Sequence, residues 1–440
     1  MAVPWKQQPQ KEYFLHNAII VNPIDGSLRH NSCLHLADGF IRGISSVAPA
    51  ESNAAIHVDL NGKYVCPGLM DCHVHITAVP GGKGLSETFT MHPDRSKLRQ
   101  PFVCRQILQR GFTTIRDCGG ATLALKEALA DGVIQGPRLF IAGHALSQTG
   151  GHGDIRDSFD STRPHGDDCC AGMITGLGRI VDGVDECLKA SRDELRLGAD
   201  FLKIMAGGGV ASPTDALEHL QFSGSEIAAI TSAATHRETY VTAHAYTPQS
   251  IRHAIYNGVR GIEHGNLIDR ETARLMAERG VFLTPTLVTY AQMASDEWRG
   301  FLPPELQEKN EKVLAAGLRS LQIAKEEGVT ICYGTDLLGA MTSAQTKEFS
   351  IRSQALSALD ILQSATINPA RMMGQENRLG QIKEGFLADL LILDQNPLDN
   401  IKIFDEPDKH LLAVLKEGRV QVSRWSKMPQ EVFGLLPVIE

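Results

Sequence analysis

The stretch that decides the fold is Gly68-Leu69-Met70-Asp71-Cys72-His73-Val74-His75. It follows an apolar run and has the composition of a β-strand that ends in two histidines. Side chains alternate between the faces of a strand, so the two imidazoles share one face, and Asp71 shares it with them. Two imidazoles at a strand end can chelate a borderline metal such as zinc. A lone His-x-His pair is also typical of packed or exposed histidines, so the metal interpretation depends on the ends of other strands.

Downstream of this strand the chain alternates between strands and amphipathic helices. Apolar segments of strand length lie at 69–75, 113–118, 138–143, 201–206, 240–245, 261–264, 281–286 and 330–336. Between them, helical periodicity covers 186–197, 225–236, 248–257, 269–279 and 306–327, with a last helix expected near 343–366. Eight strands, most of them followed by a helix, predict an α/β fold of the (β/α)8 TIM-like barrel type with parallel strands.

The two chain ends have a different pattern. Residues 13–66 predict short strands, with a hairpin turn at Asp38-Gly39, and they are too few to bury a core alone. Strands return after residue 370, with a second hairpin turn at Glu417-Gly418. We therefore expect residues 1–66 and 370–440 to form one small β-sandwich domain and residues 67–369 to form the barrel domain. Two long segments, 77–95 and 147–178, follow the first and third barrel strands, where loops surround the active site of a barrel.

Metal-binding residue types stand at or near the ends of four further strands. They are Lys203, His244, His264 and Asp336. A charged lysine is costly to bury, which favours a neutral amine that can add carbon dioxide and become a carbamate, an anion able to bridge two cations. Taken alone, a lysine that reaches solvent or pairs with an acid is the simpler explanation. Together with His73 and His75, however, the set closes strands one, four, five, six and eight, and a two-metal site explains all of them at once.

In this order, the motifs His-x-His, Lys, His, His-Gly and Gly-Thr-Asp resemble those of the binuclear amidohydrolase superfamily. The segment 380–390, Gly-x-Ile-x-x-Gly-x-x-Ala-Asp-Leu, resembles the return strand of the same superfamily. The finer pattern is similar to the imidazolonepropionase-related branch, which contains Xaa-Pro dipeptidases, aminoacyl-arginine or -lysine carboxypeptidases and ochratoxinase. It is carried by the segments 149–154, 203–210, 244–246 and 262–265.

The resemblance implies a role for each of these residues. His73, His75 and Asp336 would hold one divalent metal ion and His244 and His264 a second, with N6-carboxylated Lys203 bridging the two. Zinc is the first choice for both metals. A hydroxide bridging the metals would attack an amide carbonyl, with Asp336 as the general base and then acid. Tyr246 and His152 would bind the carboxylate of the substrate, although Tyr246 could equally be a packed aromatic residue and His152 a loop residue without this role.

Three functions compete at this point. The leading hypothesis is metal-dependent hydrolysis of an amide or peptide C–N bond in a small substrate with a free carboxylate, such as a dipeptide or an N-acyl amino acid related to ochratoxin. The second is a mononuclear deaminase of cyclic amidines or an imidazolone-type ring hydrolase, a class that usually lacks the bridging lysine. The third is a non-catalytic binding homologue, a class that tends to lose ligands, whereas all six ligand positions are filled here.

The composition of the chain argues against some classes of binding partner. The net charge of −8 and the absence of a Lys/Arg cluster give no electrostatic case for nucleic acid, and no apolar run is long enough to span a membrane. The nine cysteines follow no repeating spacing, which favours free thiols in a reducing compartment. The polar segment 1–13 has no apolar region of the kind that a secretory signal needs. We therefore expect a cytoplasmic protein that acts on a small molecule and forms a homo-oligomer.

Overall fold

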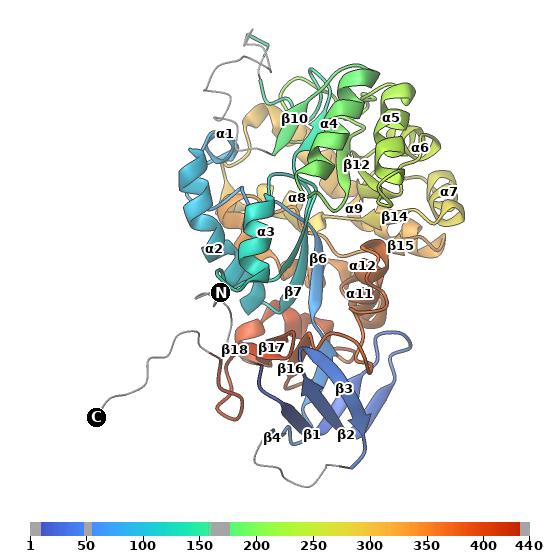
Figure 1. The fold of residues 1–440 in the computed structure, drawn as a ribbon. Helices are drawn as coiled ribbons and strands as arrows, with labels where there is room; N and C mark the ends of the chain where they lie inside the picture. Colours follow the sequence, from blue (N-terminus) through green and yellow to red (C-terminus); the bar gives the residue numbers. More distant parts are fainter. Residues whose placement is uncertain (1–9, 48–54, 157, 160–176, 432–440) are drawn as a thin grey trace.

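The barrel lies above a β-module to which both ends of the chain contribute (Figure 1). This computed structural model describes residues 10–47, 55–156, 158–159 and 177–431. The module is one eight-stranded sheet of β1 (Tyr13–Val21), β2 (Leu28–Ala37), β3 (Phe40–Ser45), β4 (Ile56–Asp59), β5 (Tyr64–Pro67), β16 (Leu390–Leu393), β17 (Leu411–Lys416) and β18 (Arg419–Ser423). The two predicted hairpin turns are present, with positive φ at Asp38, Gly39, Glu417 and Gly418.

All eight predicted barrel strands are present. They are β6 (Leu69–Val74), β7 (Phe112–Asp117), β8 (Arg138–Ile141), β11 (Leu202–Met205), β12 (Val241–Ala245), β13 (Gly261–His264), β14 (Phe282–Thr284) and β15 (Thr330–Ile331). The third strand is interrupted, because β8 pairs with β7 whereas β9 (Ala145–Ser147) pairs with β11 and with β10 (Gly178–Ile180). The barrel closes where the Cys72 N–H donates to the Tyr333 carbonyl and the Asp336 N–H donates to the His73 carbonyl, both at 2.8 Å.

Helices follow most of the strands, as the periodicity predicts. They are α1 (Leu85–Phe89), α2 (Pro93–Gln109), α3 (Leu123–Ala130), α4 (Val184–Arg196), α5 (Gly224–Thr235), α6 (Pro248–Tyr256), α7 (Arg270–Arg279), α8 (Leu287–Met293), α9 (Gln307–Glu326), α10 (Lys347–Arg352), α11 (Ala358–Ser364), α12 (Ile367–Met372) and α13 (Pro407–His410). No helix in the described ranges has the length and apolar character that crossing a bilayer requires.

Two expectations about connecting segments need correction. The single helix expected near 343–366 is two helices, α10 and α11, because the Ser357 hydroxyl accepts the Asp360 N–H and starts a new helix there. The segment 77–95 is not one long loop, since it contains α1 and the first turn of α2. Most of the segment 147–178 lies outside the described residues.

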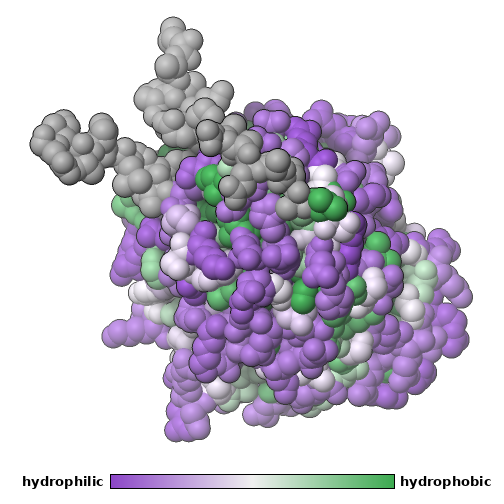
Figure 2. All heavy atoms as spheres, turned by 90° about the horizontal axis from the view of Figure 1, so that it is seen from below, coloured by the Kyte–Doolittle hydropathy of each residue, from purple (hydrophilic) through white to green (hydrophobic). Residues whose placement is uncertain are grey.

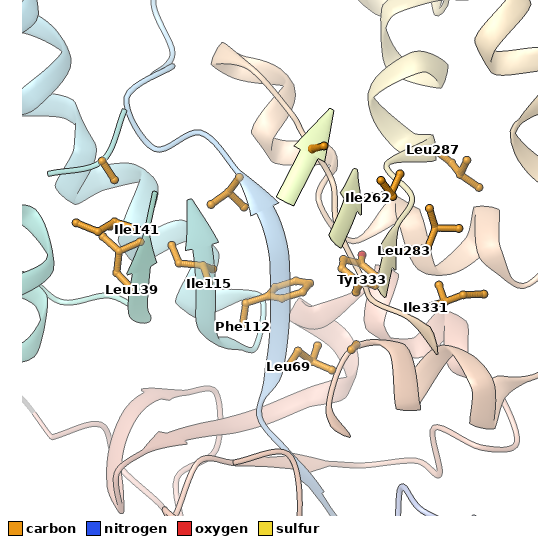
Figure 3. Close-up of a cluster of buried hydrophobic side chains, with 14 of the residues drawn as sticks. Leu69, Phe112, Ile115, Leu139, Ile141, Ile262, Leu283, Leu287, Ile331 and Tyr333 are labelled. Atoms are coloured by element: carbon orange, nitrogen blue, oxygen red, sulfur yellow. The ribbon is translucent and has the colours of Figure 1, made fainter. Parts of the chain in front are cut away.

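The barrel core extends down to the module. Figure 3 shows side chains from β6, β7, β8, β13, β14 and β15 converging between the strands and the helices. In β16 the side chains alternate, because Leu390 and Ile392 pack in the module core whereas Leu391 and Leu393 pack in the barrel core. One strand therefore serves two hydrophobic cores. The face seen from the module end is mostly hydrophilic, with hydrophobic residues scattered in small groups (Figure 2).

Gly68 is the point at which the chain passes from the module into the barrel. A Cβ atom there would lie 2.1 Å from the Thr113 hydroxyl of β7, so only glycine permits this approach. The Gly68 N–H donates to the Asp389 carbonyl at 2.9 Å. The strand pair β5–β16 therefore continues directly into β6, which carries the first two histidines.

Removal of Asp389 should weaken the attachment of the module. Its carboxylate accepts Arg138 of β8 at 2.6 Å, and Arg138 also bonds Glu417 at 2.6 Å. Asp389→Ala leaves a largely buried guanidinium short of a partner, so we expect a loss of about 3 kcal/mol, measured as a lower urea midpoint. The control is Asp408→Ala, since the 87% exposed Asp408 pairs with Arg424 at the surface and should cost less than about 1 kcal/mol. Equal losses would contradict this role.

Asp405 should make stability depend on pH. One carboxylate oxygen accepts the Ser350 hydroxyl, the other is buried without a partner among the described residues, and burial raises the pKa of Asp405 to about 7. In the unfolded chain the Asp405 carboxyl ionises near pH ~4. Because the folded protein keeps this carboxyl protonated up to about pH 7, the free energy of unfolding falls as the pH rises from about 4 to about 7. We expect Asp405→Asn to have a higher Tm than the parent at about pH 8 but not at about pH 4. Calorimetry at both values tests this, with the exposed Asp399→Asn as control, and an unchanged Tm difference between the two pH values would refute it.

Candidate metal centre

The six predicted ligands lie at the carboxyl ends of the barrel strands. His73 lies in β6 and His75 just after it, Lys203 in β11, His244 in β12, His264 at the end of β13 and Asp336 after β15. All six line one cavity. The backbone is in the left-handed region at His264 (φ 71°) and Asp336 (φ 53°), an uncommon conformation for residues other than glycine and one that clusters at functional sites.

Three of the six side chains form a compact group. Asp336 Oδ1 lies 3.4 Å from His73 Nε2 and 3.2 Å from His75 Nε2. One ligand atom from each of these residues lies within 4.8 Å of the others, which is the spacing of a metal site. The His264 ring centroid lies 4.9 Å from that of His73 and 4.5 Å from that of His244. The structure thus brings together the residues that the sequence analysis selected, while their role as ligands stays a prediction.

Each histidine has one ring nitrogen committed to another partner. Nδ1 of His73 meets Glu263 at 2.8 Å, and Nδ1 of His75 donates to the Gly119 carbonyl at 3.0 Å. His264 uses Nδ1 toward the Thr286 hydroxyl at 2.8 Å, whereas His244 uses Nε2 toward the Gly208 carbonyl at 3.2 Å. The second nitrogen of each ring is therefore available to a metal, and in His73 and His75 it faces Asp336, another predicted ligand. Burial lowers the pKa of His244 and His264 well below the ordinary value, which favours the neutral ring that a metal needs.

Lys203 fits the same interpretation. Its side chain is buried and lines the cavity together with five histidines, and no described residue accepts a hydrogen bond from its amine. A buried amine without an acceptor is unfavourable, whereas a carbamate would offer two oxygens to cations. Asp336 supplies a second anion, because the neighbouring histidines outweigh burial and hold the pKa of its carboxyl well below the ordinary value. The donor set of four imidazoles and two oxygen groups suits zinc.

Glu263 is a site residue that the sequence analysis missed. It is fully buried and bonds Arg116 at 2.5 Å and the Thr242 hydroxyl in addition to His73. Burial alone would raise the pKa of Glu263, but Arg116 and His73 hold it well below the ordinary value. The sequence did contain a signal for this pair, because Glu263 and Arg116 are charged residues inside two otherwise apolar strands. Arg116 and Asp117 are neighbours in the sequence, which allows an ion pair or a position facing the substrate, but Arg116 pairs with Glu263, and the described residues show no Arg116–Asp117 ion pair.

Other polar residues near the strand ends hold the backbone. Asp117 accepts the N–H groups of Ile76, Gly119 and Ala121 at 2.7–3.1 Å. Asp71 accepts the His73 N–H at 3.1 Å as well as Thr335 and Gln345, so it positions the peptide and not a histidine ring.

His144 follows the third predicted strand, where it could support a ligand histidine, but it lies outside the lining of the cavity. Its ring bonds Glu194 at 3.2 Å, and its side chain is 41% exposed. No contact with a metal-centre residue supports that role.

The two predicted substrate residues line the cavity. The Tyr246 hydroxyl bonds the Tyr290 hydroxyl at 2.8 Å, and the His152 ring stacks on His244 with centroids 4.1 Å apart. Tyr290 and Met293 also line it, whereas Leu287 packs in the barrel core. An adjoining cavity shares Met205, Ala211 and Leu338 with the first and adds the apolar side chains of Phe89, Ile155 and Leu177.

Comparisons with known proteins agree with this geometry. The amidohydrolase family profile matches residues 64–421. Ochratoxinase of Aspergillus niger is 32% identical over 414 residues, which is 90% of this chain and 84% of that protein. An amidohydrolase crystal structure has a TM-score of 0.90 at 44% identity, and a prolidase in complex with N-methylphosphonate-L-proline has 0.89 at 39%, each covering 94% of this chain and 100% of the other. Because the profile spans most of the chain and places the strand-end residues in one domain, the chain belongs to the amidohydrolase family of hydrolytic enzymes.

Proposed function

We propose that this enzyme hydrolyses the amide bond of a small N-acyl amino acid or dipeptide with a free carboxylate. The observation that carries the proposal is the convergence of His73, His75, Lys203, His244, His264 and Asp336 on one cavity. The similarity to ochratoxinase and to a prolidase supports an amide or peptide bond as the target. Lys203 in the cavity argues against the mononuclear alternative, which usually lacks it.

The residues divide into two ligand groups. His73, His75 and Asp336 would hold one divalent ion, His244 and His264 would hold the second, and carboxylated Lys203 would belong to both. Two bound zinc ions would lower the pKa of a water toward neutrality and polarise the scissile carbonyl.

Asp336 is the residue suited to move the proton. The low pKa of its carboxyl keeps it ionised, as a general base requires, and Oδ1 lies within 3.4 Å of both His73 and His75. It would take the proton of the attacking water and deliver it to the leaving nitrogen. The Asp71 carboxylate bonds both the His73 N–H and the Thr335 hydroxyl, which precedes Asp336, and so holds the two ligand segments together.

The substrate would lie over Tyr246 and His152, with an apolar part in the adjoining cavity of Phe89, Ile155 and Leu177. A panel that varies the acyl group and the amino acid separately tests this proposal. We expect cleavage of N-acyl amino acids or dipeptides with a free carboxylate and much slower cleavage of their methyl esters or amides. Equal rates with the blocked substrates would contradict the carboxylate requirement.

Lys203→Met should remove the bridging group while keeping an unbranched stem. We expect the metal content to fall from about two ions per chain to one or fewer, and activity to fall by at least about a thousandfold. Plasma mass spectrometry gives the metal content, and carbon-13 NMR after reconstitution with labelled bicarbonate tests for the carbamate. The matched control is Lys416→Met, since Lys416 is also buried but bonds the Gly136 carbonyl away from the cavity. Full metal content and activity in Lys203→Met would overturn the bridging role.

Glu263→Gln should weaken metal binding through His73. Glutamine keeps one acceptor oxygen, for Arg116, and would turn its NH2 group toward the His73 Nδ1–H donor, so the ligand ring would lose the bond that orients it and Arg116 would lose its negative partner. We expect metal affinity to fall by about 10- to 100-fold, measured by competition with a chelator. Glu194→Gln is the control, because Glu194 is equally buried but holds His144 and Arg179 outside the cavity. An unchanged affinity in Glu263→Gln would exclude this role.

Several expectations stay predictions. They are the domain boundaries at 1–66 with 370–440 and at 67–369, the homo-oligomer, the cytoplasmic location and the absence of nucleic-acid and membrane partners. The sheet that joins β5 to β16 supports the first of them.

A further inference from the structure

The loop after β11 contacts two histidines of the cavity at once. The Gly208 carbonyl accepts His244 Nε2 at 3.2 Å. At Gly209, a Cβ atom would lie 1.9 Å from His152 Nδ1, so glycine is needed for the His152 ring to lie over this loop. The same loop therefore contacts both a predicted metal ligand, His244, and a predicted substrate residue, His152.

Asp215 of this loop is a buried carboxylate surrounded by donors. The Gly209 N–H and the Gln221 side-chain amide donate to Oδ2 at 3.1 Å and 2.8 Å, and the Ser212 hydroxyl donates to Oδ1. Lys309 of α9 lies 3.5 Å from Oδ1 and donates to the Gly209, Ser212 and Asp215 carbonyls. The position of Asp215 is thus set from several sides.

Two hydrogen-bonded chains connect Asp215 to His152, one through Gln221 and one through Ser212. Gln221, which donates to Asp215, accepts the His152 backbone N–H at 2.9 Å. Ser212, whose hydroxyl donates to Asp215, lies 2.8 Å from His152 Nδ1. Because a serine hydroxyl has a single proton, Ser212 accepts from His152, and Nδ1 of His152 carries a hydrogen. No described residue bonds Nε2 of this ring, and His152 lines the cavity.

We propose that Ser212 and Asp215 are positioning residues that hold His152 as the Nδ1–H tautomer, so that Nε2 faces the substrate as a hydrogen-bond acceptor. An Nε2 without hydrogen accepts from an N–H group of the substrate and does not bind the carboxylate that the sequence led us to expect. This inference rests on the proposed function, because it assigns the substrate contact of that site to one ring atom. The observations that carry it are the buried Asp215–Ser212–His152 chain, the second link through Gln221 and the glycine that makes room for the ring.

A double-mutant cycle tests whether Ser212 acts through His152. Ser212→Ala is the sharpest variant, because it leaves Asp215 bonded to Gly209 and Gln221. We expect KM for the best substrate of the panel to rise about tenfold with little change in kcat, and this effect to vanish when His152 is already alanine. Ser191→Ala, a buried serine of α4 that bonds the Cys187 carbonyl, is the control and should change neither constant. Additive effects of Ser212→Ala and His152→Ala would overturn the proposal.

A second measurement does not depend on turnover. Nitrogen-15 NMR of histidine-labelled, zinc-loaded protein reports which ring nitrogen carries hydrogen, and the His152 signal is identified by its loss in His152→Gln. We expect the Nδ1–H form in the parent and in Ser191→Ala, and a mixture of tautomers in Ser212→Ala. If no substrate of the panel is cleaved, the proposed function fails, and this spectrum still decides the inference. The Nε2–H form in the parent, or an unchanged His152 signal in Ser212→Ala, would refute it.

Discussion

A carboxylate buried without partners is among the costliest features that a protein can contain, and Glu263 is buried at the centre of this barrel. It is stabilised only because Arg116, Thr242 and His73 all bond to it. These partners come from β7, β12 and β6, so satisfying one charge requires four strands to be in register. The same requirement fixes the ring of His73, and the geometry of the metal centre follows from it.

The sequence predicted much of the fold because its signals are local. Strand and helix periodicity located all eight barrel strands, and side-chain alternation placed His73 and His75 on one face. The interruption between β8 and β9 and the separation of α10 from α11 were not predicted, since they depend on pairing with distant strands and on a cap at Ser357.

The candidate site was predictable for the residues that end strands, because a parallel barrel gathers all strand ends at one rim. The sequence could not predict the residues that hold a ligand or a substrate residue in position without touching the metal or the substrate themselves. Arg116 lies next to Asp117 in the sequence, whereas its ion-pair partner Glu263 is 147 positions away in the chain. Ser212 and Asp215 lie in a loop whose sequence has no periodicity, and only the folded chain shows that they meet His152, 60 positions from Ser212. Contacts between residues so far apart in the chain form only in the tertiary structure and leave no local pattern in the sequence.

The sheet that pairs β5 with β16 has a consequence for biosynthesis. A ribosome produces β1 to β5 more than three hundred residues before β16 emerges, so the edge of β5 and the apolar face beside it stay uncovered while the whole barrel is made. Contacts so distant in sequence close slowly. The nascent N-terminal strands of this protein are consequently exposed to aggregation until β16 emerges, and chaperones would protect them during that time.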